Sequence, residues 1–212
     1  MPTPARPDWN LEQRLWSRGL AAVAGVDEAG RGALAGPVVA AVVLLPAGRD
    51  YPYRDSKSLA PAVRARLAAR VKSEAIAFAC GYSTAALVDE VNVLEATKQA
   101  ARAAVAEIAK LIDGLVTDYL VLGTGLPEVA VAKADAHSYQ VAAASILAKH
   151  TRDTVLTRYE DEYPGYGFGR HFGYGVPQHL DALRRLGPCA EHRRTFAPVT
   201  RLGSFTNGET DA

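Results

Sequence analysis

Two apolar segments near the N-terminus enclose a short acidic and glycine-rich motif. Residues 23–26 lead into Asp27-Glu28-Ala29-Gly30-Arg31-Gly32, and residues 38–45 follow after Gly36-Pro37. Both apolar segments are typical of buried strands. A buried strand that ends in two adjacent carboxylates is unstable unless something cationic compensates their charge. Mg²⁺ and Mn²⁺ are usual compensating ions, because carboxylate oxygens suit hard cations.

The glycines of this motif have two interpretations. In an ordinary polar turn, Gly30 or Gly32 takes a positive φ. In a ligand site, a glycine lets the backbone approach a ligand where a Cβ would obstruct it. The complete motif, placed between two apolar strands, favours the ligand site.

Apolar periodicity predicts helices and strands that alternate along the chain. We expect helices at residues 11–20, 59–75, 88–112, 138–159 and 177–186, and strands at residues 21–26, 37–45, 76–82, 115–122 and 129–133. A loop is expected at residues 163–176. This order predicts a mixed α/β sheet with helices on its faces. With 212 residues and no internal repeat or linker, one compact domain is expected.

Charge is balanced overall but unevenly distributed. There are 24 basic and 23 acidic residues, for a net charge of +1, and basic residues gather in residues 54–72 and 184–201. Such patches suit a surface that meets phosphates, although a solvated helix face gives the same pattern. Cys80 and Cys189 have neither metal-site nor disulfide spacing. No segment is typical of a membrane span or a signal peptide, so a cytoplasmic protein is expected.

Two further acids stand at predicted strands. Asp118 shares the apolar face of residues 115–122, and Asp135 follows strand 129–133, where ligands of open α/β sheets gather. Either acid alone fits a salt bridge, a cap or a turn. Together with Asp27 and Glu28 they form the kind of carboxylate group that two-metal phosphoryl chemistry needs. The chain has no phosphate-binding Gly-x-x-x-x-Gly-Lys loop, no zinc spacing of histidines and no Gly-x-Ser-x-Gly elbow.

Several motifs, in collinear order over residues 21–200, resemble those of the type 2 ribonucleases H, the ribonuclease HII family. They are Asp27-Glu28-Ala29-Gly30-Arg31-Gly32, Asp55-Ser56-Lys57-Ser58-Leu59, and the runs at residues 89–94, 145–153, 163–168 and 192–196. The resemblance implies an RNase H-like mixed five-stranded sheet flanked by helices, with a C-terminal helical extension. It divides the chain into a tail and short helix (1–20), a catalytic core (21–160), the extension (161–202) and a disordered tail (203–212).

The resemblance also implies an activity. Family members cleave RNA paired with DNA, and cut on the 5′ side of a single ribonucleotide in duplex DNA, leaving a 3′-hydroxyl and a 5′-phosphate. Two Mg²⁺ or Mn²⁺ ions would be bound by Asp27, Glu28, Asp118 and Asp135. Hybrids and ribonucleotide-containing duplexes are the implied partners, ribonucleotide excision repair the implied process, and a monomer is expected.

The implied nucleic-acid contacts come from separate motifs. The backbone of Gly30-Arg31-Gly32 would touch the ribose 2′-hydroxyl, which distinguishes RNA from DNA. Ser56 and Lys57 would hold phosphates, and Tyr174 would stack on the sugar at the RNA–DNA junction. Lys149 is a further candidate contact, although it and Arg152 also fit an ion-paired helix face with Asp153. Arg31 also fits a second role, since an arginine beside two carboxylates often orients them.

The chain departs from the family pattern at three positions. Tyr119 follows the third acid where glycine is usual, Ala134 replaces the glycine before the fourth, and Phe172 replaces a lysine in His171-Phe172-Gly173-Tyr174. Losing that lysine removes one cation near the nucleic acid. Two alternatives follow. One is the type 3 enzyme, which carries a substantial N-terminal domain; the other is a non-catalytic nucleic-acid-binding module.

Overall fold

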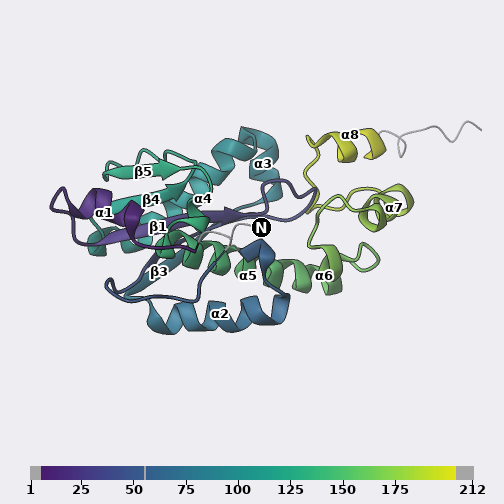
Figure 1. The fold of residues 1–212 in the computed structure, drawn as a ribbon. Coiled ribbons are helices and arrows are strands. Elements are labelled where there is room, and N and C mark those ends of the chain that lie inside the picture. The colour runs from purple at the N-terminus through teal and green to yellow at the C-terminus, as the bar shows by residue number, and fades with distance from the viewer. Residues whose placement is uncertain (1–5, 55, 204–212) are drawn as a thin grey trace, which may run out of the picture.

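The computed structural model describes residues 6–54 and 56–203, and its centre is a five-stranded sheet (Figure 1). The strand order is β3-β2-β1-β4-β5. β1 pairs antiparallel with β2 and parallel with β4, so the sheet is mixed, as predicted. The bounds are β1 (Val23–Ala29), β2 (Val38–Leu44), β3 (Ala77–Ser83), β4 (Gly114–Asp118) and β5 (Glu128–Val131).

Helices cover both faces of the sheet and extend beyond one end of it. They are α1 (Asn10–Trp16), α2 (Pro61–Glu74), α3 (Ala85–Val91), α4 (Val93–Ile108), α5 (Tyr139–Glu162), α6 (Phe168–His171), α7 (Pro177–Leu186) and α8 (Ala197–Gly203), with 3₁₀ turns η1 (Ser56–Ser58), η2 (Ala109–Leu111) and η3 (Ala134–Ala136). α5 runs under the sheet and continues toward α6, α7 and α8 (Figure 1). No helix in the described residues is long and apolar enough to cross a membrane.

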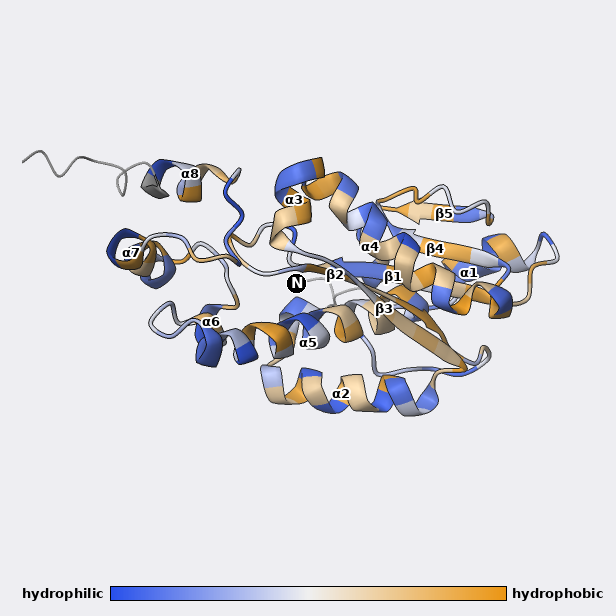
Figure 2. Ribbon diagram, turned by 180° about the vertical axis from the view of Figure 1, so that it is seen from behind, coloured by the Kyte–Doolittle hydropathy of each residue, from blue (hydrophilic) through white to orange (hydrophobic). Residues whose placement is uncertain are grey.

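β2 is buried along its whole length because it is covered on both faces. Ala41 and Val43 face the core formed with α2 and α5. Ala40 and Val42 face the second core, formed with α4. α2 shows the pattern of a helix on one face of a sheet, with hydrophilic and hydrophobic residues alternating along it (Figure 2).

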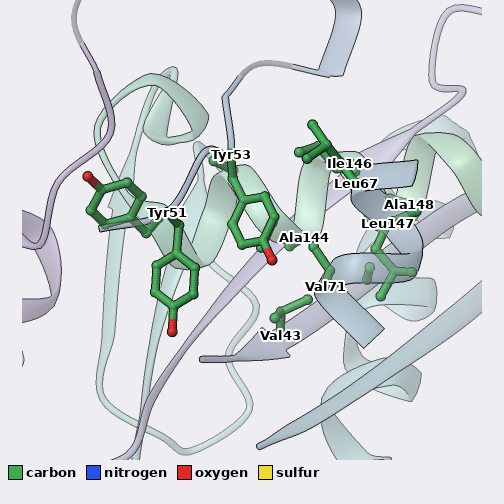
Figure 3. Close-up of a cluster of buried hydrophobic side chains, with 14 of the residues drawn as sticks. Val43, Tyr51, Tyr53, Leu67, Val71, Ala144, Ile146, Leu147 and Ala148 are labelled. Atoms are coloured by element: carbon green, nitrogen blue, oxygen red, sulfur yellow. The ribbon is translucent and has the colours of Figure 1, made fainter. Parts of the chain in front are cut away.

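The core between α2, α5 and β2 is built from aliphatic side chains with aromatic rings at one end. Figure 3 shows Val71 and Val43 beside the α5 residues, and Tyr51 and Tyr53 next to them. The two tyrosine rings stack with centroids 5.3 Å apart. The helix predicted at residues 59–75 is confirmed as α2, and its Leu67 and Val71 are buried in this core.

The prediction of one helix over residues 88–112 is wrong. Asn92, at φ 70°, ends α3 and begins α4. Its Oδ1 accepts hydrogen bonds from the backbone N–H of Leu94 and of Glu95, at 3.0 and 3.1 Å. Asparagine is a favoured N-cap and tolerates positive φ, so one residue divides the predicted helix.

Other boundaries also differ from the predictions, among them the ends of α1 at Trp16 and of β1 at Ala29. β4 ends at Asp118 rather than at residue 122, because Tyr119 takes φ 63° and turns the chain. The predicted shared strand face of Asp118, Leu120 and Leu122 is therefore wrong, although both leucines are buried. The predicted loop 163–176 contains the short helix α6. Of the tail expected at residues 203–212, Gly203 is the last residue of α8, and the rest lies outside the described residues, as do the first five residues and Asp55.

Candidate active site

The pairing of β1 with β4 brings the first and third acids to one edge of the sheet. The two strands are parallel, with Val26 opposite Thr117, so Asp27 and Asp118 follow at matching positions. Both β1 acids lie within the strand, which extends to Ala29. Asp27 is only 6% exposed. The edge therefore holds one carboxylate that water reaches poorly, that of Asp27, beside two half-buried ones.

The electrostatics show that these acids interact. Burial raises the pKa of Asp27 well above its usual value, and the charges of Glu28 and Asp118 raise it further. Burial also raises the pKa of Glu28, with Asp118 adding to the rise and Arg31 and Lys57 opposing it. The charge of Asp118 thus disfavours the charged forms of Asp27 and Glu28, and a cation bound beside these acids would relieve that effect.

Each β1 acid contacts a polar side chain that orients it. Glu28 Oε1 forms an ion pair with Arg31, at 3.2 Å. Asp27 accepts hydrogen bonds from the Ser145 hydroxyl and from the backbone N–H of Glu28, the latter at 2.7 Å. The interpretation that Arg31 orients a carboxylate is confirmed for Glu28.

Asp118 touches the segment that carries the fourth acid. Its Oδ1 accepts a hydrogen bond from the backbone N–H of Ala134, at 3.1 Å. Asp135 is the next residue, buried on η3. Within the described residues, however, no three histidine, cysteine or acidic side chains converge closely enough to hold a metal ion. The four-acid ligand set therefore stays a prediction.

η1 lies beside the β1 acids. Ser56 is buried, and its hydroxyl lies 2.9 Å from the Ser145 hydroxyl, which in turn contacts Asp27. Lys57 is close enough for its charge to lower the pKa of Glu28. The predicted phosphate contacts of Ser56 and Lys57 thus stand next to the acids, and their role stays a prediction.

Two buried arginines hold the motif in place, and sequence reasoning did not assign them this role. Arg193 donates to the carbonyls of Arg31 and Gly36, at 2.8 and 2.9 Å. Arg152 donates to the carbonyls of Pro37, Ala35 and Phe172 at 2.8 to 2.9 Å. The signal that was available is their place in the family-like runs at residues 145–153 and 192–196.

Lys149 lies in an ionic and aromatic cluster next to Tyr174. Its Nζ is 2.6 Å from Asp153 Oδ1, which confirms the ion pair expected between Lys149 and Asp153, and Asp153 Oδ2 also pairs with Arg64 at 2.8 Å. The same Nζ lies 5.0 Å from the Phe172 ring centroid and 5.1 Å from that of Tyr174. Lys149 thus supplies a cation beside Phe172, at the position where the family lysine is missing.

Comparison with known proteins decides the family. A family model described as Ribonuclease HII matches residues 24–199. The chain belongs to the ribonuclease HII family. A ribonuclease HII of Thermus thermophilus is 54% identical over 191 residues, 90% of this chain and 93% of the relative. One from Geobacillus thermodenitrificans is 48% identical over 200 residues, 92% of this chain and 77% of the relative.

Solved structures agree with the fold. Ribonuclease H2 of Pyrococcus horikoshii matches with a TM-score of 0.76 and 26% identity, over 89% of this chain and 100% of that one. RNase HII of Archaeoglobus fulgidus, solved in complex with PCNA, matches with a TM-score of 0.71 and 25% identity, over 89% of this chain and 98% of that one. The ribonuclease HII membership makes this protein a ribonuclease H, and the RNase H-like fold is confirmed.

Proposed function

We propose that this ribonuclease HII cleaves the RNA strand of RNA–DNA hybrids and the 5′ side of single ribonucleotides in duplex DNA. The products carry a 3′-hydroxyl and a 5′-phosphate. The observation that supports this most is the placement of Asp27, Glu28 and Asp118 at one edge of the sheet, near enough for the charge of Asp118 to raise the pKa of Asp27 and of Glu28. Such a carboxylate group is what metal-assisted phosphodiester hydrolysis requires.

The donor chemistry of the site suits Mg²⁺ or Mn²⁺. Asp27, Glu28, Asp118 and Asp135 offer only carboxylate oxygens, and these are hard ligands. Burial and mutual repulsion disfavour the charged forms of Asp27 and Glu28. A bound cation would favour these charged forms and so offset both effects. Bst-RNase HIII, a neighbour of the same fold at 16% identity, was solved in complex with Mn²⁺. When bound, a pair of such ions would activate a water and stabilise the leaving 3′ oxygen.

The chain's own residues prepare the site in two ways. Arg31 orients Glu28, while Ser145 orients Asp27 and connects it to Ser56. Gly32 leaves the surface beside the acids open, since a Cβ there would meet nothing within 4 Å. This opening suits approach of the 2′-hydroxyl of a ribonucleotide to the backbone.

The test is a cleavage assay on a duplex with one embedded ribonucleotide, with Mn²⁺ or Mg²⁺ and with a chelator. We expect one cut on the 5′ side of the ribonucleotide with metal, none with chelator, and none on the all-DNA duplex. Asp118→Asn should abolish cleavage while the far-UV circular dichroism and the unfolding midpoint stay near wild type. Full activity of Asp118→Asn, or salt-sensitive binding without any cut by the wild type, would overturn the proposal.

A further inference from the structure

Two buried histidines in the C-terminal part of the fold have no role in the chemistry above. His179 on α7 is 0% exposed, and His192 is 1% exposed. Their Nε2 atoms lie 3.0 Å apart. His179 Nδ1 lies 3.0 Å from the carbonyl oxygen of Tyr174, and the backbone N–H of Cys189 donates to His192 Nδ1 at 3.0 Å.

These contacts fix where the protons lie, because the Cys189 thiol, whose Sγ also lies 3.1 Å from His192 Nδ1, keeps its own proton: burial raises its pKa. The Tyr174 carbonyl only accepts, so His179 Nδ1 must carry a proton and donate. The Cys189 N–H only donates, so His192 Nδ1 must be bare. The contact between the two Nε2 atoms then needs one donor and one acceptor, so His192 Nε2–H donates to His179 Nε2. The result is a directed chain from Cys189 through His192 and His179 to the Tyr174 carbonyl.

Both histidines in this chain must be neutral. A second proton on His192 would face the Cys189 N–H, and one on His179 would face the His192 Nε2–H. Burial agrees with this, since it lowers the pKa of His179 to about 4 and that of His192 to about 3. The hydrogen-bond chain therefore persists at neutral pH.

A third histidine holds the same backbone from the other side. Gly173 N–H donates to His171 Nδ1 at 3.2 Å, and Tyr174 N–H donates to the His171 carbonyl at 3.0 Å. The His171 ring stacks on that of His179, with centroids 4.4 Å apart. Gly173 itself is confined, because it has φ 75° and a Cβ there would come within 2.5 Å of the Ala35 carbonyl oxygen.

The Tyr174 ring is held separately from its backbone. Lys149 Nζ and the Arg152 guanidinium carbon lie 5.1 and 5.4 Å from its centroid. The residue is half-buried and lines a groove of about 760 Å³ between α6 and α7, together with Arg170 and Arg185. Its ring therefore stands beside cations in a groove, while its backbone is fixed by histidines.

We propose that His179 is a positioning residue for substrate binding, because its Nδ1–H fixes the Tyr174 backbone and so presents the ring to nucleic acid. The inference rests on the proposed function and on the contact expected from the family resemblance, in which Tyr174 stacks on the sugar at the RNA–DNA junction. His192 supports the same effect by fixing the tautomer of His179. A positioning role predicts a change in KM with little change in kcat.

Two substitutions of His179 separate the donor from the rest of the ring. In His179→Asn the side-chain amide nitrogen falls near the position of Nδ1 and keeps a donor toward the Tyr174 carbonyl. In His179→Gln the amide nitrogen falls near the position of Nε2, and that donor is lost. On the single-ribonucleotide duplex we expect His179→Gln to raise KM about tenfold with kcat within about twofold. His179→Asn should stay within about threefold of wild type in KM, as should the control His150→Gln on α5.

The deciding measurement is a double-mutant cycle with Tyr174→Ala. If His179 acts through the Tyr174 ring, His179→Gln adds nothing to the KM of Tyr174→Ala. Additive effects, or an equal rise in KM for His179→Asn and His179→Gln, would overturn the inference. The unfolding midpoint of each variant shows whether it is folded. If His179→Gln does not fold, the test is the KM of His179→Asn, and a KM more than about threefold above that of the wild type would overturn the inference.

Failure of this inference differs from failure of the proposed function. If Tyr174→Ala leaves KM unchanged while Asp118→Asn still abolishes cleavage, the role of Tyr174 and of His179 is wrong and the cleavage activity stands. If Asp118→Asn is fully active, the proposed site itself is wrong.

Discussion

The guanidinium of Arg152 lies directly against the α-carbon of Gly30. A Cβ on Gly30 would come within 2.0 Å of Arg152 Nε, and Gly30 also has φ 97°. Because Arg152 donates to carbonyls on both sides of this contact, at Pro37 and Phe172, it joins the acidic motif to the C-terminal segment. Packing inside the protein therefore requires a glycine at position 30, independently of any contact that Gly30 makes with nucleic acid.

Gly30→Ala should destabilise the protein, whereas Gly32→Ala should not. The first substitution forces a strained φ, at a cost of about 1–3 kcal/mol, and displaces Arg152. Gly32 has nothing within 4 Å of its Cβ position and no positive φ. Urea unfolding of both variants checks this. If Gly32 faces the substrate, Gly32→Ala keeps its stability but loses affinity for the ribonucleotide duplex. Equal losses of stability in Gly30→Ala and Gly32→Ala would contradict the interpretation.

Asp153→Asn should be strongly destabilising. Asp153 and Arg64 have side chains only 10% and 7% exposed, and Lys149 pairs with the same carboxylate. Removing it leaves two cations without their partner, at a cost of about 3 kcal/mol. The matched control is Asp181→Asn, which breaks an exposed pair with Arg185 and should change the free energy of unfolding by less than about 1 kcal/mol. Chemical denaturation at pH 7 compares them, and a loss for Asp153→Asn no larger than the control's would contradict the prediction.

Tyr119→Gly should leave the site intact and stabilise the fold. Tyr119 takes φ 63° with its side chain exposed. A non-glycine residue in this conformation destabilises the folded state by about 1–2 kcal/mol, and glycine removes this strain. Glycine also makes the unfolded chain more flexible, which offsets part of the gain in stability. We expect a gain of up to about 1 kcal/mol, measured by urea unfolding. Tyr119→Ala keeps the backbone cost and should show no such gain; equal gains would assign the effect to the ring instead.

Much of the site was predictable because it depends on strand order. The proximity of Asp27 and Asp118 follows from two parallel strands whose ends meet at one edge. The break at Asn92 could have been predicted from the local sequence, because a capping residue stands three positions before Glu95. The apolar pattern of the region continues through this break and therefore indicated a single helix.

The roles of Arg152 and Arg193 could not be predicted in this way. Their acceptors are carbonyls more than 100 residues away in the sequence, at Pro37 and Gly36. The periodicity of a helix records which face is apolar, but it does not record which distant backbone a buried cation meets. The same holds for the hydrogen-bond chain from His192 to Tyr174, which joins three separate segments.

Glu12→Gln should stabilise the protein at pH 8 and have little effect at pH 4. Burial raises the pKa of Glu12 to about 7, against a hydrogen bond from Ser138 that lowers it. The folded state therefore holds a proton that the unfolded state releases above about pH 4.5, so stability is lost as pH rises from 4.5 to 7. By linkage this costs at most about 3 kcal/mol. Urea unfolding from pH 4 to 8 should show the difference between variant and wild type growing with pH, and a constant difference would contradict the assignment.

His179 and His192 should make the protein less stable as pH falls, which is the opposite of the effect of Glu12. The loss is measured most clearly in Glu12→Gln, where the effect of Glu12 is absent. The pKa values of His179 and His192 lie near 4 and 3, below the ordinary 6.5, so the unfolded state binds protons first. Their contribution is complete above pH 6.5 and is lost as pH falls toward 4, by up to about 1.4 kcal/mol per pH unit for each histidine. His150, whose pKa burial also lowers, adds in the same direction.

Replacing both histidines with asparagine tests this assignment. His179→Asn keeps a donor toward Tyr174, and His192→Asn keeps an acceptor toward Cys189, but neither side chain titrates. In the Glu12→Gln background, the variant with both asparagines should lose less stability between pH 6.5 and pH 4.5 than Glu12→Gln alone. His150→Gln in the same background should keep most of the change in the free energy of unfolding per pH unit. An unchanged slope in the double variant would place the acid sensitivity outside the His179–His192 pair.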